Sequence, residues 1–288
     1  MLIDAHAHPN YHGHVAEKIV RNLDDQGIDT AWLLTWDAPQ SEYDAPLNQP
    51  HFNPAVEAGL PLADVVEVGR YAPERFVLGY APHPKRPDAI HRLKSAVEIY
   101  GIRLGGEYKF RLPFDDPDSI DLLRAMGELS LPVTIHLEYG TEYGGANYPW
   151  RTWWYGGTIG SLERAVVACP DTIFIGHGPG WWSHISNDGL FDKIMYPKDA
   201  PVPGGKNPTM LEEFPNMYAD LSGGSGLNAI TRDADFGRQY IVDHVDKLLF
   251  ARDTWDTKLM DHIKTLELPD DVWAKLSHEN ALRLLGSR

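Results

Sequence analysis

Two histidines two positions apart, His6 and His8, follow a short apolar start of the chain and are followed at once by Pro9. Side chains alternate between the faces of a β-strand, so both imidazoles would project to the same face. Two neutral imidazoles on one face can bind a single divalent metal ion. The spacing alone is weak, because a second pair of the same kind, His12 and His14, follows within a few residues. A metal site therefore requires further ligands elsewhere in the chain.

Three further residues of ligand type stand where apolar runs end. His136 lies near the end of the run over residues 132–137, His177 ends the run over 172–177, and Asp253 follows the run over 247–251. A single histidine of this kind is commonly a hydrogen-bonded core residue, and Asp253 could cap the next helix. All of them, together with the first pair, would nevertheless meet at one rim if the runs are parallel strands of one barrel. This convergence favours a metal site.

Apolar runs and helical segments alternate along the chain. The predicted strands cover residues 2–6, 30–35, 76–81, 102–109, 132–137, 172–177, 217–222 and 247–251. The predicted helices cover residues 15–26, 55–71, 88–100, 117–129, 158–168, 209–214, 236–245, 257–265 and 270–285. Eight strands, with no Gly-x-Gly-x-x-Gly after any of them, favour an α/β protein with a single (β/α)8 TIM barrel over a doubly wound sheet. We expect one domain over residues 1–288, with long loops at the C-terminal rim of the strands.

Composition limits the partners that the chain can have. The net charge of −15 argues against binding to nucleic acid or to an anionic membrane, because affinity for phosphate requires clustered Lys and Arg. No segment approaches the roughly 20 apolar residues of a membrane span, and no basic-then-apolar leader is visible. The single cysteine, Cys169, excludes an internal disulfide. We expect a cytoplasmic protein that acts on a small molecule; a homo-oligomer is compatible with the sequence.

The whole chain resembles a known family. A histidine pair on strand one, single histidines on strands five and six, an aspartate on strand eight and the closing segment 279–285 resemble the amidohydrolase superfamily, in particular the amidohydrolase-related group often called family 2. The resemblance implies a metal-dependent hydrolase. It also implies that the metal ligands include His6, His8, His136 and Asp253. It implies that His177 is a ligand of a second metal ion or a hydrogen-bonding partner of metal-bound groups.

Strand four decides how many ions the site holds. Members of the superfamily with two metals place a carboxylated lysine or a glutamate there as a bridge. Glu107 and Lys109 share a face of this strand. Glu107 is the better bridging ligand, since a carboxylate needs no modification, and Lys109 could hold an anionic group of the substrate. The alternative is an ion pair between Glu107 and Lys109 on the rim, so the site could hold either one or two metal ions. Zinc is the favoured metal, and manganese is the alternative.

The proposed ligands imply a mechanism. A bound divalent ion lowers the pKa of its water towards about 7 and polarises a carbonyl group. Asp253 is the expected general base, and His177 could stabilise an oxyanion. Arg252, next to Asp253, and Trp181, in the loop after strand six, are predicted substrate contacts, although rings in such loops also commonly pack against the barrel.

Three reactions fit these residues. The leading prediction is a hydrolase, such as a lactonase, that acts on a small ester, lactone or amide carrying a carboxylate. The alternative is a metal-dependent, non-oxidative decarboxylase of an aromatic or unsaturated acid, because the resemblance extends to such enzymes. A phosphodiesterase or nuclease of the related barrel type is disfavoured by the net charge of −15.

Overall fold

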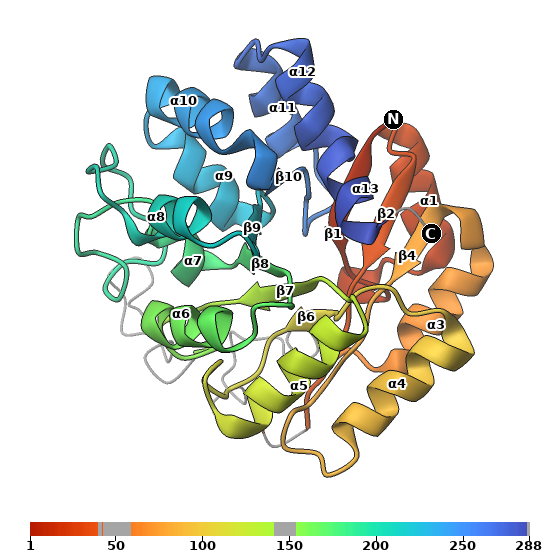
Figure 1. The fold of residues 1–288 in the computed structure, drawn as a ribbon. Helices are drawn as coiled ribbons and strands as arrows, with labels where there is room; N and C mark the ends of the chain where they lie inside the picture. The colour runs from red at the N-terminus through yellow and green to blue at the C-terminus, as the bar shows by residue number, and fades with distance from the viewer. Residues whose placement is uncertain (40–41, 43–58, 141–153, 287–288) are drawn as a thin grey trace, which may run out of the picture.

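The ring of parallel strands in Figure 1, with helices around it, belongs to a computed structural model that describes residues 1–39, 42, 59–140 and 154–286. The strands are β1 (Ile3–Ala7), β2 (Thr30–Leu33), β3 (Trp36–Asp37), β4 (Phe76–Leu78), β5 (Ala81–Pro82), β6 (Glu107–Tyr108), β7 (Val133–His136), β8 (Phe174–His177), β9 (Met217–Asp220) and β10 (Leu248–Leu249). The helices are α1 (Ala16–Asp25), α3 (Leu62–Tyr71), α4 (Ala89–Tyr100), α5 (Pro117–Glu128), α6 (Ile159–Ala168), α7 (Pro179–Ser183), α8 (Lys206–Glu213), α9 (Gly223–Thr231), α10 (Ala234–His244), α11 (Lys258–Thr265), α12 (Asp270–Ala274) and α13 (Asn280–Leu285).

Backbone hydrogen bonds join two parallel sheets into one ring. One sheet has the order β1-β2-β4 and the other the order β10-β9-β8-β7-β6. At one junction the Ala5 N–H donates to the Phe250 carbonyl at 3.0 Å, and at the other Gly79 forms a parallel bridge with Leu104. The short pair β3–β5 continues β2 and β4 beyond the ring. The prediction of a (β/α)8 barrel is confirmed. The strand predicted over 30–35 is observed as β2, with β3 directly after the predicted range, and the strand over 76–81 is observed as β4 and the start of β5.

A bulge in β1 sets the direction of the first two histidines. Asp4 pairs with Ala31 but Ala7 pairs with Leu33, so β1 contains one more residue than β2 between these two pairs. Ile3 and Ala5 belong to a cluster with apolar residues of β2, β8 and β10, the strands around the barrel interior. Regular alternation after them would aim Ala7 inward. The bulge instead allows His6 and His8 to follow on the inner side.

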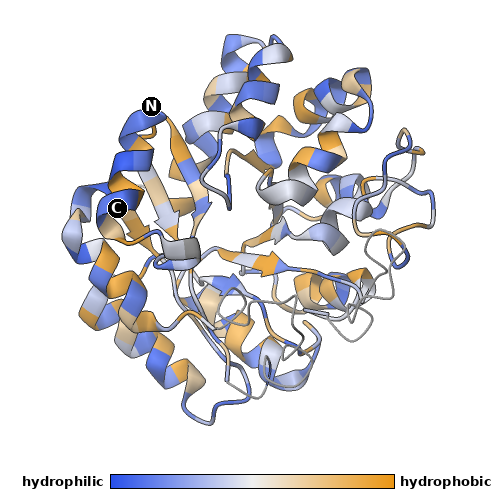
Figure 2. Cartoon of the chain, turned by 180° about the vertical axis from the view of Figure 1, so that it is seen from behind, coloured by the Kyte–Doolittle hydropathy of each residue, from blue (hydrophilic) through white to orange (hydrophobic). Residues whose placement is uncertain are grey.

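The helices cover the outside of the strands and are amphipathic. In Figure 2 the strands are mainly apolar, whereas the helices carry polar and apolar residues side by side. The boundaries follow local capping: Asp116 accepts the Asp118 N–H at 3.0 Å where α5 begins, and Thr158 forms a reciprocal capping box with Ser161 at the start of α6. The helix predicted over 55–71 is observed from Leu62, and residues 55–58 lie outside the described part of the chain.

Two helices, α7 and α9, are not among those predicted, and one predicted helix is interrupted. The glycine-rich run after β9 forms α9, and Gly226 within it lies so close to the backbone of Leu221 that any side chain there would overlap it. The predicted helix over 270–285 contains a π-helical turn over Lys275–Glu279. In this turn the Leu276 carbonyl accepts the Phe250 N–H at 2.9 Å, and this contact with the barrel accounts for the interruption.

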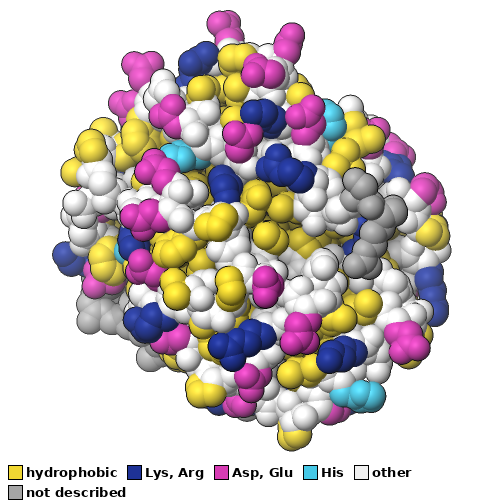
Figure 3. Space-filling model, viewed as in Figure 1, with side chains coloured by type: hydrophobic (Ala, Val, Ile, Leu, Met, Phe, Trp, Pro, Cys, Tyr) yellow, Lys and Arg dark blue, Asp and Glu magenta, His cyan; other side chains and the backbone are white. Residues whose placement is uncertain are grey.

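The surface of the described residues carries charges of both signs. On the face that Figure 3 shows, Lys and Arg side chains are interspersed with Asp and Glu. None of the described helices combines the length and the apolar character that are needed to cross a lipid bilayer.

Candidate metal centre

The first two histidines lie buried with their ring nitrogens facing each other. His6 Nε2 and His8 Nε2 are 3.1 Å apart. His8 Nδ1 donates to the Leu34 carbonyl at 2.8 Å, so its Nε2 carries a lone pair. His6 Nδ1 lies 2.9 Å from a carboxylate oxygen of Asp220. If the ring is neutral, Nδ1 donates to this oxygen, and the lone pair lies on Nε2, which faces His8 Nε2. Burial would lower the pKa of His6, but the carboxylates of Asp220, Asp253 and Glu107 outweigh it and raise the pKa to about 10, so without a metal ion a proton joins the two Nε2 atoms. A divalent metal ion can take the place of this proton.

Glu107, at the start of β6, reaches the same point from another strand. Its Oε1 lies 2.8 Å from His136 Nδ1, and its Oε2 lies 3.4 Å from His8 Nε2. Oε2 is buried and makes no hydrogen bond to a described residue, which is uncommon for a carboxylate oxygen. Burial would raise the pKa of Glu107, but the charges of Lys109, His136 and His8 outweigh it and hold the pKa well below its usual value. An ionised, incompletely bonded carboxylate is a suitable metal ligand.

A glycine directs Glu107 into the barrel. Gly106 has φ +68° and lies so close to the Thr35 carbonyl and to the backbone of Tyr80 and Ala81 that no side chain fits there. The Thr35 carbonyl accepts the N–H of Glu107 at 3.1 Å. The backbone contact with the end of β2 thus determines the height of this carboxylate in the barrel.

Asp253 closes the cluster from the strand opposite. Its Oδ1 lies 3.3 Å from His8 Nε2 and 3.7 Å from His6 Nε2, and its Oδ2 lies 3.7 Å from His177 Nε2. Burial would raise the pKa of Asp253, but the neighbouring imidazoles of His6, His8 and His177 lower it far below its usual value. Its side chain is 24% exposed, so this carboxylate also faces the solvent side of the cluster.

The backbone of Asp253 adopts a conformation that few residues accept. Its φ is +54°, in the left-handed region that is uncommon for residues other than glycine, asparagine and aspartate. Its N–H donates to the His6 carbonyl at 2.9 Å. Unusual dihedral angles of this kind are concentrated at functional sites, where the surroundings hold them in place.

The six predicted metal ligands come together in three overlapping groups. In each group the ligand atoms lie within 4.8 Å of one another. The groups are His6–His8–Glu107, His6–His177–Asp253 and Glu107–His136–His177. Glu107 belongs to two of the groups and faces each with a different oxygen, which is the arrangement expected of a bridging carboxylate.

The sequence analysis missed two buried carboxylates of this site. Asp220, the last residue of β9, contacts the Nδ1 atoms of both His6 and His177, at 2.9 and 3.1 Å. Glu138 Oε2 lies 2.9 Å from His136 Nε2. Asp220 stands at a strand end just as the predicted ligands do, so the rule that identified them would also have found it. Glu138 lies two residues after His136, on the same side of the chain.

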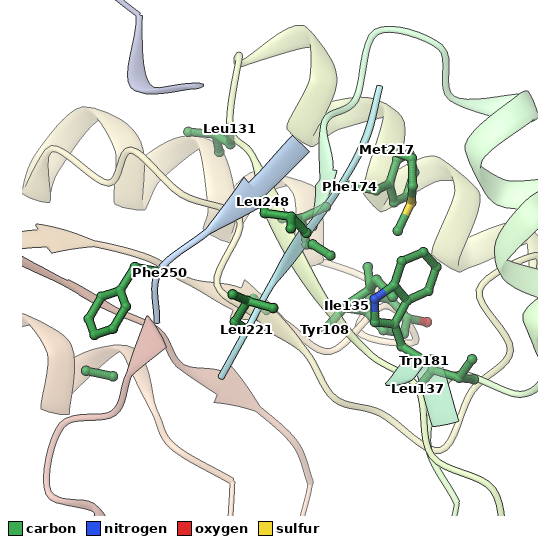
Figure 4. Close-up of a cluster of buried hydrophobic side chains, with 14 of the residues drawn as sticks. Tyr108, Leu131, Ile135, Leu137, Phe174, Trp181, Met217, Leu221, Leu248 and Phe250 are labelled. Carbon is green, nitrogen blue, oxygen red and sulfur yellow. The ribbon is translucent and has the colours of Figure 1, made fainter. Parts of the chain in front are cut away.

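Arg252 and Trp181, both predicted to contact substrate, lie elsewhere. The Arg252 side chain is buried and donates to Asp4 at 2.8 Å, to Asn22 of α1 and to Gln26 just after that helix, away from the cluster. Trp181 is 0% exposed and packs in the hydrophobic core, as Figure 4 shows beside Ile135. We therefore correct both predictions: Arg252 is an internal ion-pair partner, and Trp181 is a core residue.

Lys109 lies at the edge of the cluster. Its ammonium is 4.6 Å from the ring centroid of Trp36 and 5.5 Å from that of Tyr155, and the side chain is largely buried. Its positive charge helps to lower the pKa of Glu107 against the effect of burial. The pKa of His136 is raised by Glu107 and Glu138, against burial and against the charge of Lys109. Aromatic faces hold such a cation in place without neutralising it.

Comparison with known proteins agrees with this geometry. The family model described as Amidohydrolase matches residues 3–287. A search of curated proteins found no match.

Solved structures share the fold at low identity. The 2,6-dihydroxybenzoate decarboxylase from Rhizobium is 18% identical with a TM-score of 0.63, covering 99% of this chain and 98% of the other. A probable 2-pyrone-4,6-dicarboxylic acid hydrolase from Acinetobacter baumannii, with citric acid bound, is 14% identical with a TM-score of 0.61, covering 99% of both chains. A dihydroxybenzoic acid decarboxylase from a Polaromonas species, with manganese and 2-nitroresorcinol bound, is 18% identical with a TM-score of 0.56, covering 94% and 86%.

Proposed function

Because this chain belongs to the amidohydrolase family, we propose that it is a metal-dependent hydrolase of a small ester, lactone or amide that carries a carboxylate. The observation that carries the proposal is the convergence of histidine and carboxylate ligand atoms within 4.8 Å of one another. Two features of this cluster favour a metal ion over a purely internal network. The Nε2 atoms of His6 and His8 face each other, and the buried Oε2 of Glu107 makes no hydrogen bond to a described residue.

The proposed ligands divide into two sets, one for each of two metal ions. His6 and His8 would hold one ion with Glu107 and Asp253, and His136 and His177 would hold a second ion that shares Glu107. A bound divalent ion supplies water of lowered pKa and polarises a carbonyl group. Zinc is the metal we propose for this set of imidazoles and carboxylates, with manganese as the alternative.

Asp253 is proposed as the general base. Its carboxylate reaches the solvent side of the cluster, and its depressed pKa keeps it ionised at neutral pH, the form that a base requires. After the attack it would return this proton to the leaving group. The backbone contact with His6 holds the carboxylate in place while the proton moves.

Lys109 is proposed to bind the carboxylate of the substrate. Its ammonium stands beside the ligands Glu107 and His136, and the rings of Trp36 and Tyr155 border it. A flat, anionic substrate would contact the ammonium with its carboxylate and the rings with its apolar face. This position supports a substrate with a carboxylate next to the reacting carbon.

The same position also supports a second candidate, the non-oxidative decarboxylation of an aromatic or unsaturated acid. Two of the solved structures with this fold are described as dihydroxybenzoate-type decarboxylases. In that reaction the carboxylate near Lys109 would leave as CO₂, and a protonated group of the chain would return a proton to the ring carbon. The two reactions differ in their products and are separated by one assay.

The assay compares lactones, carboxylated aryl esters and hydroxybenzoic acids as substrates of the purified chain, before and after treatment with a chelator. We expect net acid release without CO₂, loss of turnover after chelation, and recovery with Zn²⁺ or Mn²⁺. Evolution of CO₂ from a hydroxybenzoic acid would replace the hydrolase by the decarboxylase. Turnover that survives removal of every metal ion would overturn the metal-dependent function, and faster cleavage of bis(p-nitrophenyl) phosphate would indicate a phosphodiesterase.

Replacing Glu107 by glutamine is expected to reduce the number of bound metal ions from two to one. An amide offers a single acceptor oxygen, so it cannot serve the His8 side and the His136 side together. Elemental analysis of the purified variant and wild type, with protein concentration from absorbance, measures the change. Glu163→Gln, which alters a surface ion pair with Lys206, is the control and should leave the count unchanged. A wild type that binds one ion would disprove the bridge.

A further inference from the structure

We propose that Asp220 is a positioning residue that orients two metal ligands at once, His6 and His177. The inference rests on the metal site proposed above and extends it to a residue outside the ligand set. Asp220 ends β9, is 0% exposed and lies behind the two imidazoles as seen from the cluster. It would touch neither a metal ion nor a substrate.

The contacts of Asp220 settle which nitrogen of each ring carries hydrogen. Its Oδ2 lies 2.9 Å from His6 Nδ1, and its Oδ1 lies 3.1 Å from His177 Nδ1. An ionised carboxylate only accepts hydrogen bonds, so both Nδ1 atoms must donate. When the rings are neutral, as they must be to bind a metal ion, both Nε2 atoms therefore direct lone pairs at the cluster. Asp253 lies near both Nε2 atoms, and Glu107 lies near that of His177. A carboxylate behind a ligating imidazole fixes its tautomer and increases its basicity in the same way.

Ser222 holds this carboxylate in its bridging position. Its hydroxyl donates to Asp220 Oδ1 at 2.5 Å, and its backbone N–H donates to the same oxygen at 3.2 Å. The hydroxyl oxygen is 2.8 Å from His177 Nδ1. The carboxylate is therefore anchored from its own strand end and is not free to turn towards one imidazole alone.

Each remaining imidazole has an acceptor of its own. The Leu34 carbonyl orients His8, and Glu138 orients His136. Asp220 is different because two rings depend on one side chain, and the centroids of these rings are 4.3 Å apart. A change at this position therefore acts on all three overlapping ligand groups, since each contains His6 or His177.

Because two imidazoles share the Asp220 carboxylate, an amide is a poor replacement for it. Asparagine at position 220 has the same shape but offers one acceptor oxygen and one donor NH₂ group. The amide oxygen can accept from one imidazole, but the NH₂ group requires a lone pair on Nδ1 of the other. That second ring must then carry its hydrogen on Nε2, and it can no longer bind a metal ion.

The experiment compares Asp220→Asn with Glu138→Gln and with the wild type, using Zn²⁺ alone as the probe. We expect Asp220→Asn to bind Zn²⁺ about 10–100-fold more weakly, as measured by competition with a chromogenic chelator. Glu138 serves one imidazole, so a glutamine there can turn its oxygen to His136 and should cost much less. Asp246→Asn, which changes a surface ion pair with Lys275, is the control for the loss of a negative charge.

Long-range ¹H–¹⁵N spectra of the imidazoles give a readout that a purely structural role would not change. In the Zn²⁺-loaded wild type, His6 and His177 should both carry hydrogen on Nδ1. In Asp220→Asn, one of the two should carry it on Nε2. This measurement on the wild type tests the inference even when the variant does not fold, because hydrogen on Nε2 of either ring would overturn it.

The outcomes separate this inference from the proposed function. A wild type that takes up no Zn²⁺ would overturn the metal site and the role of Asp220 together. A wild type that binds Zn²⁺, with Asp220→Asn binding equally well or both rings keeping hydrogen on Nδ1, would overturn only the role of Asp220.

Discussion

Replacing Asp253 by asparagine is expected to lower turnover by about 10²–10⁴-fold while most of the bound metal is retained. Asparagine keeps an oxygen that can bind a metal ion, but it cannot accept the proton that the mechanism assigns to this position. It also tolerates the left-handed backbone, φ +54°, that Asp253 adopts, so the loop should keep its shape. Turnover of the substrate identified in the panel and the metal content of the same preparation are the two measurements.

Asp256→Asn is the matched control for this variant. Asp256 lies three residues further along the same loop and pairs with Lys258 at the surface. It should retain nearly full activity. One further variant, Asp253→Ala, would distinguish the causes of any loss: it should lose metal as well, because it removes the ligand. Turnover of Asp253→Asn within about threefold of the wild type would show that another group accepts the proton.

Replacing Asp4 by asparagine is expected to lower the free energy of unfolding by about 3–5 kcal/mol, because a buried guanidinium would lose its counter-charge. Asp4 Oδ2 accepts from Arg252 Nε at 2.8 Å, and Oδ1 accepts the Arg252 backbone N–H at 2.8 Å. Both side chains are buried. The pair joins β1 to the residue that precedes Asp253, so we expect weaker metal binding as well.

Urea unfolding measures this effect as a lower midpoint at unchanged slope. The control is Asp24→Asn, whose carboxylate pairs with Arg75 at 2.7 Å but is 60% exposed, and it should cost less than about 1 kcal/mol. Replacing both partners, Asp4 by leucine and Arg252 by methionine, should recover most of the stability, since no charge is then left buried. A midpoint for Asp4→Asn equal to that of Asp24→Asn would contradict the assigned role of the pair.

The barrel itself could be predicted from local sequence patterns. Continuous apolar runs bounded by helices are typical of strands buried on both faces, and the observed ring of strands follows those runs. His136 and His177 could be located because they end such runs, and the ends of parallel strands in a barrel meet at one rim. Asp220 satisfies the same rule, so its omission was a failure to apply the rule and not a limit of the sequence.

The directions of individual side chains required the tertiary structure. Arg252 and Asp253 are neighbours in sequence, yet one side chain turns outward to Asp4 and the other joins the metal cluster. Trp181 follows a strand end and still packs into the core, because Gly176 leaves space for its ring.

The sequence by itself determined which residue types stand at the strand ends, because strand formation depends on a local run of apolar residues. Only the tertiary structure decided which of them face the cluster. The bulge in β1 aims His6 and His8 inward, and Gly106, with φ +68°, aims Glu107. The positive φ of Asp253 does the same on the opposite strand. Each of these turns is held by backbone contacts with another strand, and residues far apart in the chain supply those contacts.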